Sequence, residues 1–302
     1  MSMEVRNYTF PGSKLSVKVM ISDELGFCVT STLIMGEKDC VLVDCQWTRS
    51  NAYRVIAEIA ETNLNLKAVF ATHAHPDHYW GIGHIGEAFP NAKLYAMAED
   101  IPVIDEQFNS KTEHWESVIG KVNLCRLKPT IEPLPESNII DLEGEEIIVY
   151  PRVWGDLKYN TVVWVPSIKT FIGSDVLFSN AHPFTCEVSA KGRYKWYKDL
   201  EKFSQFGAQL VVPGHVRQGE VLDERAFKVT MDYLRETERE LEKTKDVKEF
   251  FYDMCMKFPE ATLIFLSNDM NSSVFLGGRE WSWSDMNDDD GIPLPRWWAD
   301  EE

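Results

Sequence analysis

Hydrophobic and polar residues alternate along the first part of the chain in short runs that are typical of strands. Three such runs, 15–22, 27–35 and 40–44, are separated by turn-forming residues. Residues 51–62 then place their apolar side chains at helical spacing, and a further apolar run, 67–72, follows. This order predicts three strands, a helix and a fourth strand that ends at a cluster of histidines.

The alternation of strands and helices continues to the end of the chain. Further strands are predicted at 93–96, 146–150, 161–165, 170–173 and 209–212, and further helices at 82–89, 99–122, 194–203, 223–243, 247–257 and 259–275. Strands separated by helices indicate an α/β fold. We expect a single domain, 1–302, with a core at about 15–240 and C-terminal helices and an acidic, Trp-rich tail within 246–302.

Composition narrows the function classes. The chain has 302 residues, 44% of them hydrophobic, and its 31 Lys and Arg against 48 Asp and Glu give a net charge of −17. This charge disfavours nucleic acid and anionic membranes as partners. No apolar stretch is long enough to span a bilayer, and no signal peptide is evident, so we expect a cytoplasmic protein with a small-molecule substrate. The cysteines form no CxxC pair, and we interpret them as reduced structural residues.

The densest chemistry lies directly after the predicted strand 67–72. The segment Thr72-His73-Ala74-His75-Pro76-Asp77-His78 places three histidines and one aspartate within six positions of one loop. Imidazole and carboxylate groups together suit zinc, iron or manganese, with zinc somewhat favoured by neutral imidazole. The segment therefore predicts a metal site.

This segment matches the HxHxDH motif of the metallo-β-lactamase superfamily. Upstream, 41–44 resembles the strand that carries the family's structural aspartate, Asp44; downstream, 171–175 and 211–215 resemble the strands that end in a metal-bridging aspartate, Asp175, and a last histidine ligand, His215. The resemblance covers residues 15–240. It implies an αββα sandwich, the metallo-β-lactamase fold, with extra C-terminal helices.

One position departs from the family pattern. Where the family has a Gly-His pair before the strand that leads to the bridging aspartate, this chain has Gly155-Asp156. A carboxylate still binds metal, although it favours harder, oxygen-preferring ions more than imidazole does. Asp156 is either a ligand or a turn-capping residue beside a weak or empty metal site.

The resemblance also implies a ligand set and a reaction. One metal ion is expected on His73, His75 and Asp156, and a second on Asp77, His78 and His215, with Asp175 between them. Two zinc ions per chain are expected, with iron or manganese as alternatives. A metal-bound hydroxide would attack a substrate carbonyl, and Asp77 would also be catalytic, orienting the nucleophile and passing a proton to the leaving group.

The substrate is predicted less sharply. The segments 155–167 and 180–184 are similar to fungal enzymes that open benzoxazolinone-type cyclic amides, which favours a lactamase or lactonase. An aromatic-lined pocket suits a flat, neutral ring. Substrate contacts are predicted for five residues near the motifs, namely Tyr79, Trp80, Trp154, His182 and Phe184. His84 and His114 have no ligand-like neighbours in sequence and are interpreted as structural.

Two alternatives remain open. A glyoxalase II-like thioesterase would need cationic residues for an anionic substrate, and Lys158, Lys191 or Arg193 would supply them. A non-catalytic metal- or partner-binding protein on the same scaffold is the other alternative, motivated by Asp156. The tail, with Trp281, Trp283, Trp297 and Trp298, is expected to pack on its own domain, to close over the pocket or to mediate a homodimer.

Overall fold

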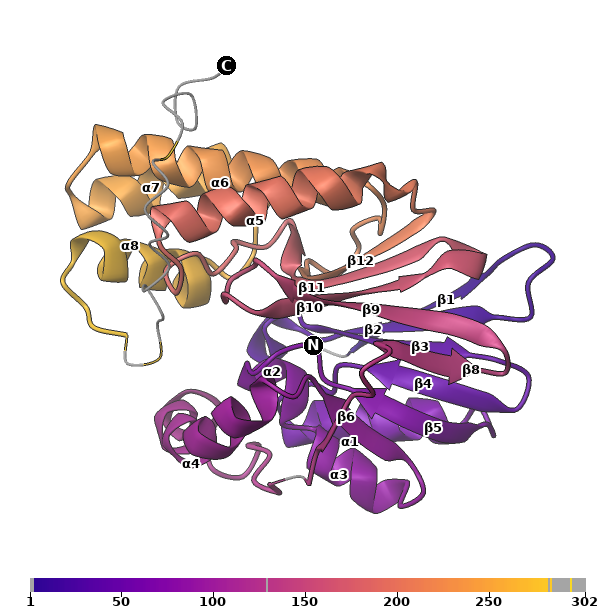
Figure 1. Ribbon diagram of the computed structural model, residues 1–302. Helices are drawn as coiled ribbons and strands as arrows, with labels where there is room; N and C mark the ends of the chain where they lie inside the picture. Colours follow the sequence, from indigo (N-terminus) through magenta and orange to yellow (C-terminus); the bar gives the residue numbers. More distant parts are fainter. Residues whose placement is uncertain (1–2, 129, 282, 284–293, 295–302) are drawn as a thin grey trace. The chain divides into compact units, whose positions relative to one another are not determined.

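The computed structural model describes residues 3–128, 130–281, 283 and 294 (Figure 1). Trp297 and Trp298 of the tail lie outside the described residues. The chain forms two compact units that interleave in sequence: an N-terminal unit, Met1–Pro151 with Val162–Ile172, and a C-terminal unit, Arg152–Thr161 with Gly173–Glu302. The expectation of one domain stays a prediction, and each unit is described by itself below.

A seven-stranded sheet forms the frame of the N-terminal unit. Its strands follow in chain order as β1 (Glu4–Thr9), β2 (Ser16–Ile21), β3 (Thr30–Met35), β4 (Asp39–Val43), β5 (Asn65–Phe70), β6 (Lys93–Ala96) and β7 (Glu132–Pro133). Neighbours are antiparallel from β1 to β4 and parallel from β4 to β7. The switch occurs where a helical crossover replaces the tight turns, because parallel strands cannot be joined by a hairpin.

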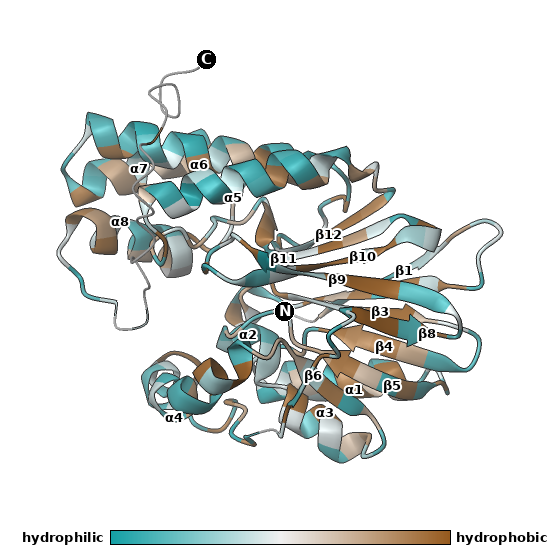
Figure 2. Cartoon of the chain, in the orientation of Figure 1, coloured by the Kyte–Doolittle hydropathy of each residue, from teal (hydrophilic) through white to brown (hydrophobic). Residues whose placement is uncertain are grey.

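The N-terminal unit also contains the short 3-10 helix η1 (Glu24–Gly26) and the helices α1 (Arg49–Ala60), α2 (Pro76–Tyr79), α3 (Ile82–Ala88) and α4 (Asp100–Ile119). The four α-helices contribute apolar side chains to the core of this unit. Thr48 caps α1 by accepting a hydrogen bond from the Asn51 backbone N–H. Val55 of α1 and Ile85 of α3 are buried in one core with Leu42 of β4, and hydrophobic residues dominate the central strands (Figure 2).

A second sheet has five strands, in the order β12-β11-β10-β9-β8. Their bounds are β8 (Ile139–Leu142), β9 (Glu145–Val153), β10 (Asn160–Val165), β11 (Thr170–Ser179) and β12 (Leu210–Val216). Between β10 and β11 the chain turns through a 3-10 turn, η2 (Pro166–Ile168), with Lys169 in the left-handed region at φ 46°. The strands β10 and β11 therefore form an antiparallel hairpin.

The C-terminal unit contains the helices α5 (Ala190–Phe203), η3 (Ser204–Phe206), α6 (Arg225–Lys243), α7 (Val247–Lys257), the π-helix η4 (Ile264–Asn268) and α8 (Asp269–Leu276). Of these, α5 and α6 bond to β11. The Trp196 indole of α5 donates to the Val176 carbonyl oxygen at 2.8 Å. Thr230 of α6 accepts from the Phe178 backbone N–H at 3.0 Å. Tyr233, with Phe250 and Met254 of α7, forms a smaller core.

Most predicted elements are confirmed, and the differences have local causes. The strand expected from residue 27 begins at Thr30, because Phe27 and Cys28 have positive φ angles of 63° and 56°. The mixed helices expected at 99–122 are one helix, α4, in which Pro102 is tolerated in the first turn. The helix expected at 259–275 begins only after Leu263, which is left-handed at φ 64°. The half-exposed edge strand β1 was missed.

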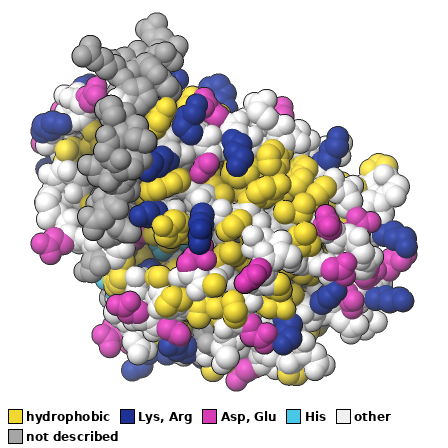
Figure 3. Space-filling model, viewed as in Figure 1, with side chains coloured by type: hydrophobic (Ala, Val, Ile, Leu, Met, Phe, Trp, Pro, Cys, Tyr) yellow, Lys and Arg dark blue, Asp and Glu magenta, His cyan; other side chains and the backbone are white. Residues whose placement is uncertain are grey.

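Charged side chains of both signs lie on the surface, and the cysteines form no disulfides, as the sequence predicts. On the face drawn in Figure 3, Lys and Arg side chains are interspersed with Asp and Glu. All six cysteines are free of disulfide bonds, and all but Cys255 are buried; the buried ones are Cys28, Cys40, Cys45, Cys125 and Cys186. Among the described residues, no helix combines the length and apolar character that a membrane crossing requires. The cytoplasmic location stays a prediction.

The contact between α6 and β11 yields a stability prediction. Thr230→Val keeps the shape of the side chain but removes the hydroxyl that accepts from Phe178 N–H and donates to the Ala226 carbonyl oxygen at 2.9 Å. Because a buried donor loses its partner, the free energy of unfolding should fall by roughly 1–3 kcal/mol. Urea denaturation measures this change. Thr230→Ser, which retains the hydroxyl, is the control; an equal loss in both variants would assign the effect to packing.

Candidate metal centre

Four predicted ligands of the N-terminal unit lie in one tight turn at the end of β5. His73 and His75 precede α2, and Asp77 and His78 lie within it, because Pro76 starts the helix directly after His75. The ring centroids of His73 and His75 are 4.9 Å apart, and those of His73 and His78 are 4.4 Å apart. His78 Nε2 lies 3.7 Å from Asp77 Oδ2. The structure therefore brings these four side chains together.

Asp44, at the end of the neighbouring strand β4, fixes this turn. Its carboxylate accepts hydrogen bonds from the Thr72 backbone N–H at 2.9 Å and the Thr72 hydroxyl at 3.0 Å. It also pairs with His78 Nδ1 at 2.8 Å. Burial raises the pKa of Asp44, against the lowering effect of His78 and Thr72. Because Nδ1 faces Asp44, His78 presents Nε2 as its ligand atom.

Three further predicted ligands lie together in the C-terminal unit. Asp175 of β11 and His215 of β12 place Oδ2 and Nε2 at 3.1 Å from each other. The His215 ring stacks on Phe178, with centroids 5.1 Å apart and an interplanar angle of 7°. Asp156 lies in the loop between β9 and β10, and its backbone N–H donates to the Asp175 carbonyl oxygen at 3.3 Å. Asn160 Nδ2 donates to Asp156 Oδ1 at 3.0 Å.

Two glycines let these side chains approach the backbone. A Cβ on Gly214 would lie 2.1 Å from Asp175 Oδ1, and a Cβ on Gly155 would lie 2.7 Å from Asn160 Nδ2. Both contacts are closer than real side chains allow, so another residue at Gly214 would displace Asp175 and another residue at Gly155 would displace Asn160, which holds Asp156. Ser174, directly before Asp175, is in the left-handed region at φ 45°. Such backbone conformations of non-glycine residues concentrate at functional sites.

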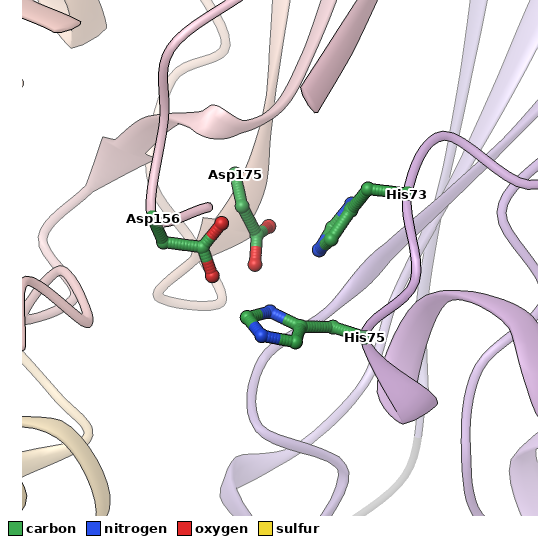
Figure 4. Close-up of side chains that lie close together, drawn as sticks. All are labelled: His73, His75, Asp156 and Asp175. Carbon is green, nitrogen blue, oxygen red and sulfur yellow. The ribbon is translucent and has the colours of Figure 1, made fainter. Parts of the chain in front are cut away.

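The donor chemistry fits divalent cations. All seven predicted ligands are buried, and none exposes more than 8% of its surface. Burying three carboxylates is costly unless hydrogen bonds or cations compensate their charge. Imidazole and carboxylate ligands suit zinc, and also iron and manganese. Figure 4 draws two of these side chains from each unit, His73 and His75 with Asp156 and Asp175.

A family model described as the metallo-beta-lactamase superfamily matches residues 26–215, a range that contains all seven ligands. The chain belongs to the metallo-β-lactamase superfamily. The predicted α/β metallo-β-lactamase fold with extra C-terminal helices is thereby confirmed. The general functional prediction, a metal-binding hydrolase of this superfamily, is confirmed as well.

Individual relatives are distant. Metallo-beta-lactamase IND-1 of Chryseobacterium indologenes is 25% identical over 192 residues, which are 63% of this chain and 72% of that protein. A hydroxyacylglutathione hydrolase of Vibrio cholerae is 35% identical over only 69 residues, 22% of this chain and 26% of that protein. The resemblance to the fungal benzoxazolinone enzymes stays a prediction.

Solved metallo-β-lactamases share the fold. The enzyme from Pontibacter korlensis aligns with a TM-score of 0.57 and 19% identity, over 78% of this chain and 99% of that one. FIM-1 from Pseudomonas aeruginosa in its mono-zinc form aligns with a TM-score of 0.55 and 16% identity, over 78% and 96%. At these identities the likeness shows the fold alone.

Three of the residues predicted to contact substrate are buried in the core. Tyr79 and Trp80 are fully buried, and the Trp80 ring packs 6.2 Å from Trp47. His182 is also fully buried, with Nδ1 3.0 Å from the Tyr233 hydroxyl. Side chains enclosed in this way offer no surface to a substrate, so the structure assigns all three to packing.

The two remaining aromatic residues lie in half-buried positions. The Trp154 backbone N–H donates to Asp199 of α5 at 2.9 Å, and Lys195 Nζ lies 4.8 Å from the centroid of the Trp154 ring. Phe184 packs edge-on against Trp281. Both side chains keep part of their surface exposed, so their predicted role in substrate binding stays open.

Two buried charged residues of α4 escaped the sequence analysis. Lys111 Nζ lies 3.4 Å from the carbonyl oxygen of Ala74, the residue between His73 and His75. Burial raises the pKa of Asp100 to about 8. The helical spacing of the buried residues Ile104 and Phe108 places Lys111 on the same face, and this spacing was the available signal.

The site yields a prediction about metal affinity. Asp44→Asn removes a charged acceptor and places an amide N–H₂ against donors from Thr72 and His78, so the ligand turn should lose its fixed orientation. We expect metal affinity to fall about 10- to 100-fold. Competition with a chromogenic chelator measures this. Asp39→Asn, at the opposite end of β4, is the matched control; equal affinities in the two variants would contradict the role of Asp44.

His182 yields a prediction about acid stability. Burial lowers its pKa to about 4, whereas the unfolded value is about 6.5. The unfolded chain therefore binds the proton more readily, and stability present at pH 7 is lost as the pH falls below 6.5. Between pH 7 and 5 this loss should be about 2 kcal/mol.

Urea unfolding at the two pH values tests this, since His182→Gln should remove that part of the acid sensitivity. His114→Gln, which removes a half-buried histidine from the N-terminal unit, controls for the loss of a histidine as such. An unchanged pH dependence in His182→Gln would show that the neutral, buried imidazole is not responsible.

Proposed function

We propose that the chain is a hydrolase that opens small cyclic amides or esters, with a dinuclear metal centre. The observation that carries this proposal is the composition of two candidate ligand groups with one shared aspartate, Asp175. A carboxylate that belongs to both ligand groups would suit a pair of divalent cations held close together.

The ligand sets follow from these groups. The first ion is assigned to His73, His75 and Asp156, with Asp175 as the shared ligand (Figure 4). The second ion is assigned to Asp77, His78 and His215, again with Asp175 as the shared ligand. Support comes from the family match, which covers residues 26–215. Zinc is proposed, with iron or manganese as alternatives because Asp156 adds a carboxylate.

The chain's own residues then have separate tasks. A divalent cation supplies Lewis acidity, which lowers the pKa of water and polarises a carbonyl oxygen. Asp77 is a ligand and is also assigned the proton transfer, through a carboxylate oxygen, to the leaving nitrogen or oxygen. Asn160 holds Asp156 at Oδ1, and Asp44 holds His78 at Nδ1, so each acts by positioning a ligand.

Ring opening of a lactam or lactone is the favoured reaction. One relative, of which 72% aligns with this chain, is a metallo-beta-lactamase by name. Trp154 and Phe184 offer half-buried aromatic surface on the two loops of the C-terminal unit that flank Asp156 and Asp175 in sequence. Aromatic surface with few charges suits a flat, neutral substrate. A small-molecule substrate, no nucleic-acid or membrane partner, and a homodimer as one assembly stay predictions.

A thioesterase is the second candidate, favoured by the short match to a hydroxyacylglutathione hydrolase. An anionic thioester needs cations near the site. Arg193 is not available for this purpose, because its guanidinium pairs with Glu238 in the interior of the C-terminal unit. Lys158 and Lys191 remain as candidates.

Metal content and turnover test the proposal together. Protein purified without added metal or chelator should contain two metal ions per chain by mass spectrometry, and Asp156→Ala should contain about one. Chelation should abolish hydrolysis of a lactam or lactone from a panel that also contains thioesters, and added zinc or manganese should restore it.

Asp141→Asn, an exposed aspartate, is the control and should keep both ions. Preferential turnover of thioesters would move the assignment to the second candidate. Bound metal without turnover of any ester, amide or thioester would favour the non-catalytic alternative, and one ion or none in the unmodified chain would overturn the dinuclear centre.

A further inference from the structure

Thr72 joins two of the proposed histidine ligands through one buried carboxylate. Its hydroxyl donates to Asp44 Oδ2 at 3.0 Å and lies 3.1 Å from His73 Nδ1. The same oxygen of Asp44 pairs with His78 Nδ1 at 2.8 Å. A continuous chain of hydrogen bonds therefore runs from one imidazole ring to the other.

The direction of each hydrogen bond in this chain follows from the donors available. Asp44 accepts as a carboxylate, so the single hydroxyl proton of Thr72 points to Asp44 Oδ2. Toward His73 the hydroxyl oxygen can then only accept, and His73 Nδ1 must carry the hydrogen. His73 therefore presents Nε2 as its ligand atom, as His78 does, and each ring is held in one tautomer.

The two histidines belong to different candidate ligand groups. Their ring centroids lie 4.4 Å apart, at an interplanar angle of 44°. The orientation of each ring therefore decides which group its donor atom joins. His73 is grouped with the other side chains of Figure 4, namely His75, Asp156 and Asp175, and His78 is grouped with Asp77, Asp175 and His215.

The interior of the N-terminal unit encloses the whole chain of hydrogen bonds. Thr72, His73 and His78 expose none of their surface, and Asp44 exposes 2%. In such surroundings a hydrogen bond is stronger than in water, and neighbouring bonds polarise one another. The loss of one member also leaves a buried polar atom without its partner, which is costly. A change at Asp44 should therefore reach both histidines.

The contacts of His78 do not depend on the Thr72 hydroxyl. The Cys45 backbone N–H donates to the His78 carbonyl oxygen at 2.8 Å, which fixes the main chain of His78 while Asp44 fixes its ring. The Thr72 backbone N–H donates separately to Asp44 Oδ1 at 2.9 Å. Removal of the hydroxyl alone therefore leaves Asp44 in place against His78 and takes the acceptor only from His73.

We propose that Thr72 is a positioning residue whose hydroxyl extends the orienting effect of Asp44 to His73, so that one buried carboxylate orients a histidine of each metal ion. Thr72 then acts on the first ion alone, whereas Asp44 acts on both ions. The inference rests on the proposed function, because it assigns the two histidines to two ions. It deepens that function by linking the occupancy of the two metal positions through a single residue.

Zinc affinity in chains that keep one ion tests this division. Asp156→Ala removes a ligand of the first ion and His215→Ala a ligand of the second, so each variant should bind one zinc ion. Added to His215→Ala, Thr72→Val should weaken zinc binding about tenfold; added to Asp156→Ala, it should leave zinc binding unchanged. Asp44→Asn should weaken zinc binding in both. Competition with a chromogenic chelator measures these dissociation constants.

Thr72→Ser is the matched control, because it keeps the hydroxyl and loses only a methyl group. It should retain the zinc affinity of the corresponding one-ion chain in both backgrounds. The melting temperature of each metal-free variant is measured as well, so that a general loss of structure is recognised. An equal loss of zinc affinity in Thr72→Val and Thr72→Ser, or an equal loss in the two backgrounds, would overturn the role of the hydroxyl.

The ring nitrogens of His73 give a measurement that needs no bound metal. Nitrogen-15 NMR of the metal-free, unmodified chain at neutral pH should show the His73 hydrogen on Nδ1, with the signal identified by its absence in His73→Gln. In Thr72→Val the two tautomers should exchange, because the acceptor that selects one of them is lost. A His73 hydrogen on Nε2 in the unmodified chain would overturn the inference even if Thr72→Val failed to fold.

The two measurements separate this inference from the proposed function. Zinc affinities that follow the expected division, in a chain that hydrolyses no lactam or lactone, would overturn the proposed reaction and retain the role of Thr72. A chain that binds a single ion would overturn the dinuclear centre, and a hydrogen on His73 Nδ1 would then still retain Thr72 as the positioning residue of His73. Two bound ions that respond equally to Thr72→Val would overturn the inference alone.

Discussion

The Asp44 carboxylate is the constraint on which the ligand turn of the N-terminal unit depends. It lies at the end of β4 and ties down the residues that follow β5, the parallel neighbour, by accepting from Thr72 and His78. Without it, no hydrogen bond to Nδ1 would fix the orientation of the His78 ring in a turn that carries four proposed ligands. Asp44 itself has φ 61°, a conformation that is costly for aspartate and that the hydrogen bonds stabilise. The strained backbone conformation of Asp44 therefore serves to orient His78.

In the C-terminal unit the proposed ligands are positioned by close contact with glycine backbone rather than by a buried carboxylate. Gly214 removes the side chain that would collide with Asp175, and Gly155 does the same for Asn160, which holds Asp156. Each glycine directly precedes a proposed ligand in sequence. In each of the pairs Gly214-His215 and Gly155-Asp156, the glycine therefore leaves space for a neighbouring side chain, and the second residue supplies the donor atom.

How much the sequence could predict depends on how local each feature is. The ligands were accessible because strand ends followed by His and Asp form compact motifs, and the helices because their apolar spacing is regular. The burial of Tyr79, Trp80 and His182 was not accessible, since an aromatic residue beside a motif has the same local pattern whether it faces a core or a pocket. Nor was the bond between Trp281 and Glu187, because it joins residues 94 positions apart with no periodic signal between them. Lys111 lies between these cases: its helical register was readable, but its contact with Ala74 was not.

Charge connects the proposed metal centre with the proposed substrate. Three aspartates in the ligand set, Asp77, Asp156 and Asp175, contribute −3 against the +4 of two divalent cations, which leaves a net charge of +1; a neutral histidine in place of Asp156 would leave +2. The lower charge weakens the attraction for anionic substrates, and Arg193, the arginine closest in sequence to Phe184, is neutralised by Glu238. We propose that a centre with little excess positive charge acts on neutral substrates through polarisation of the carbonyl rather than through ion pairing.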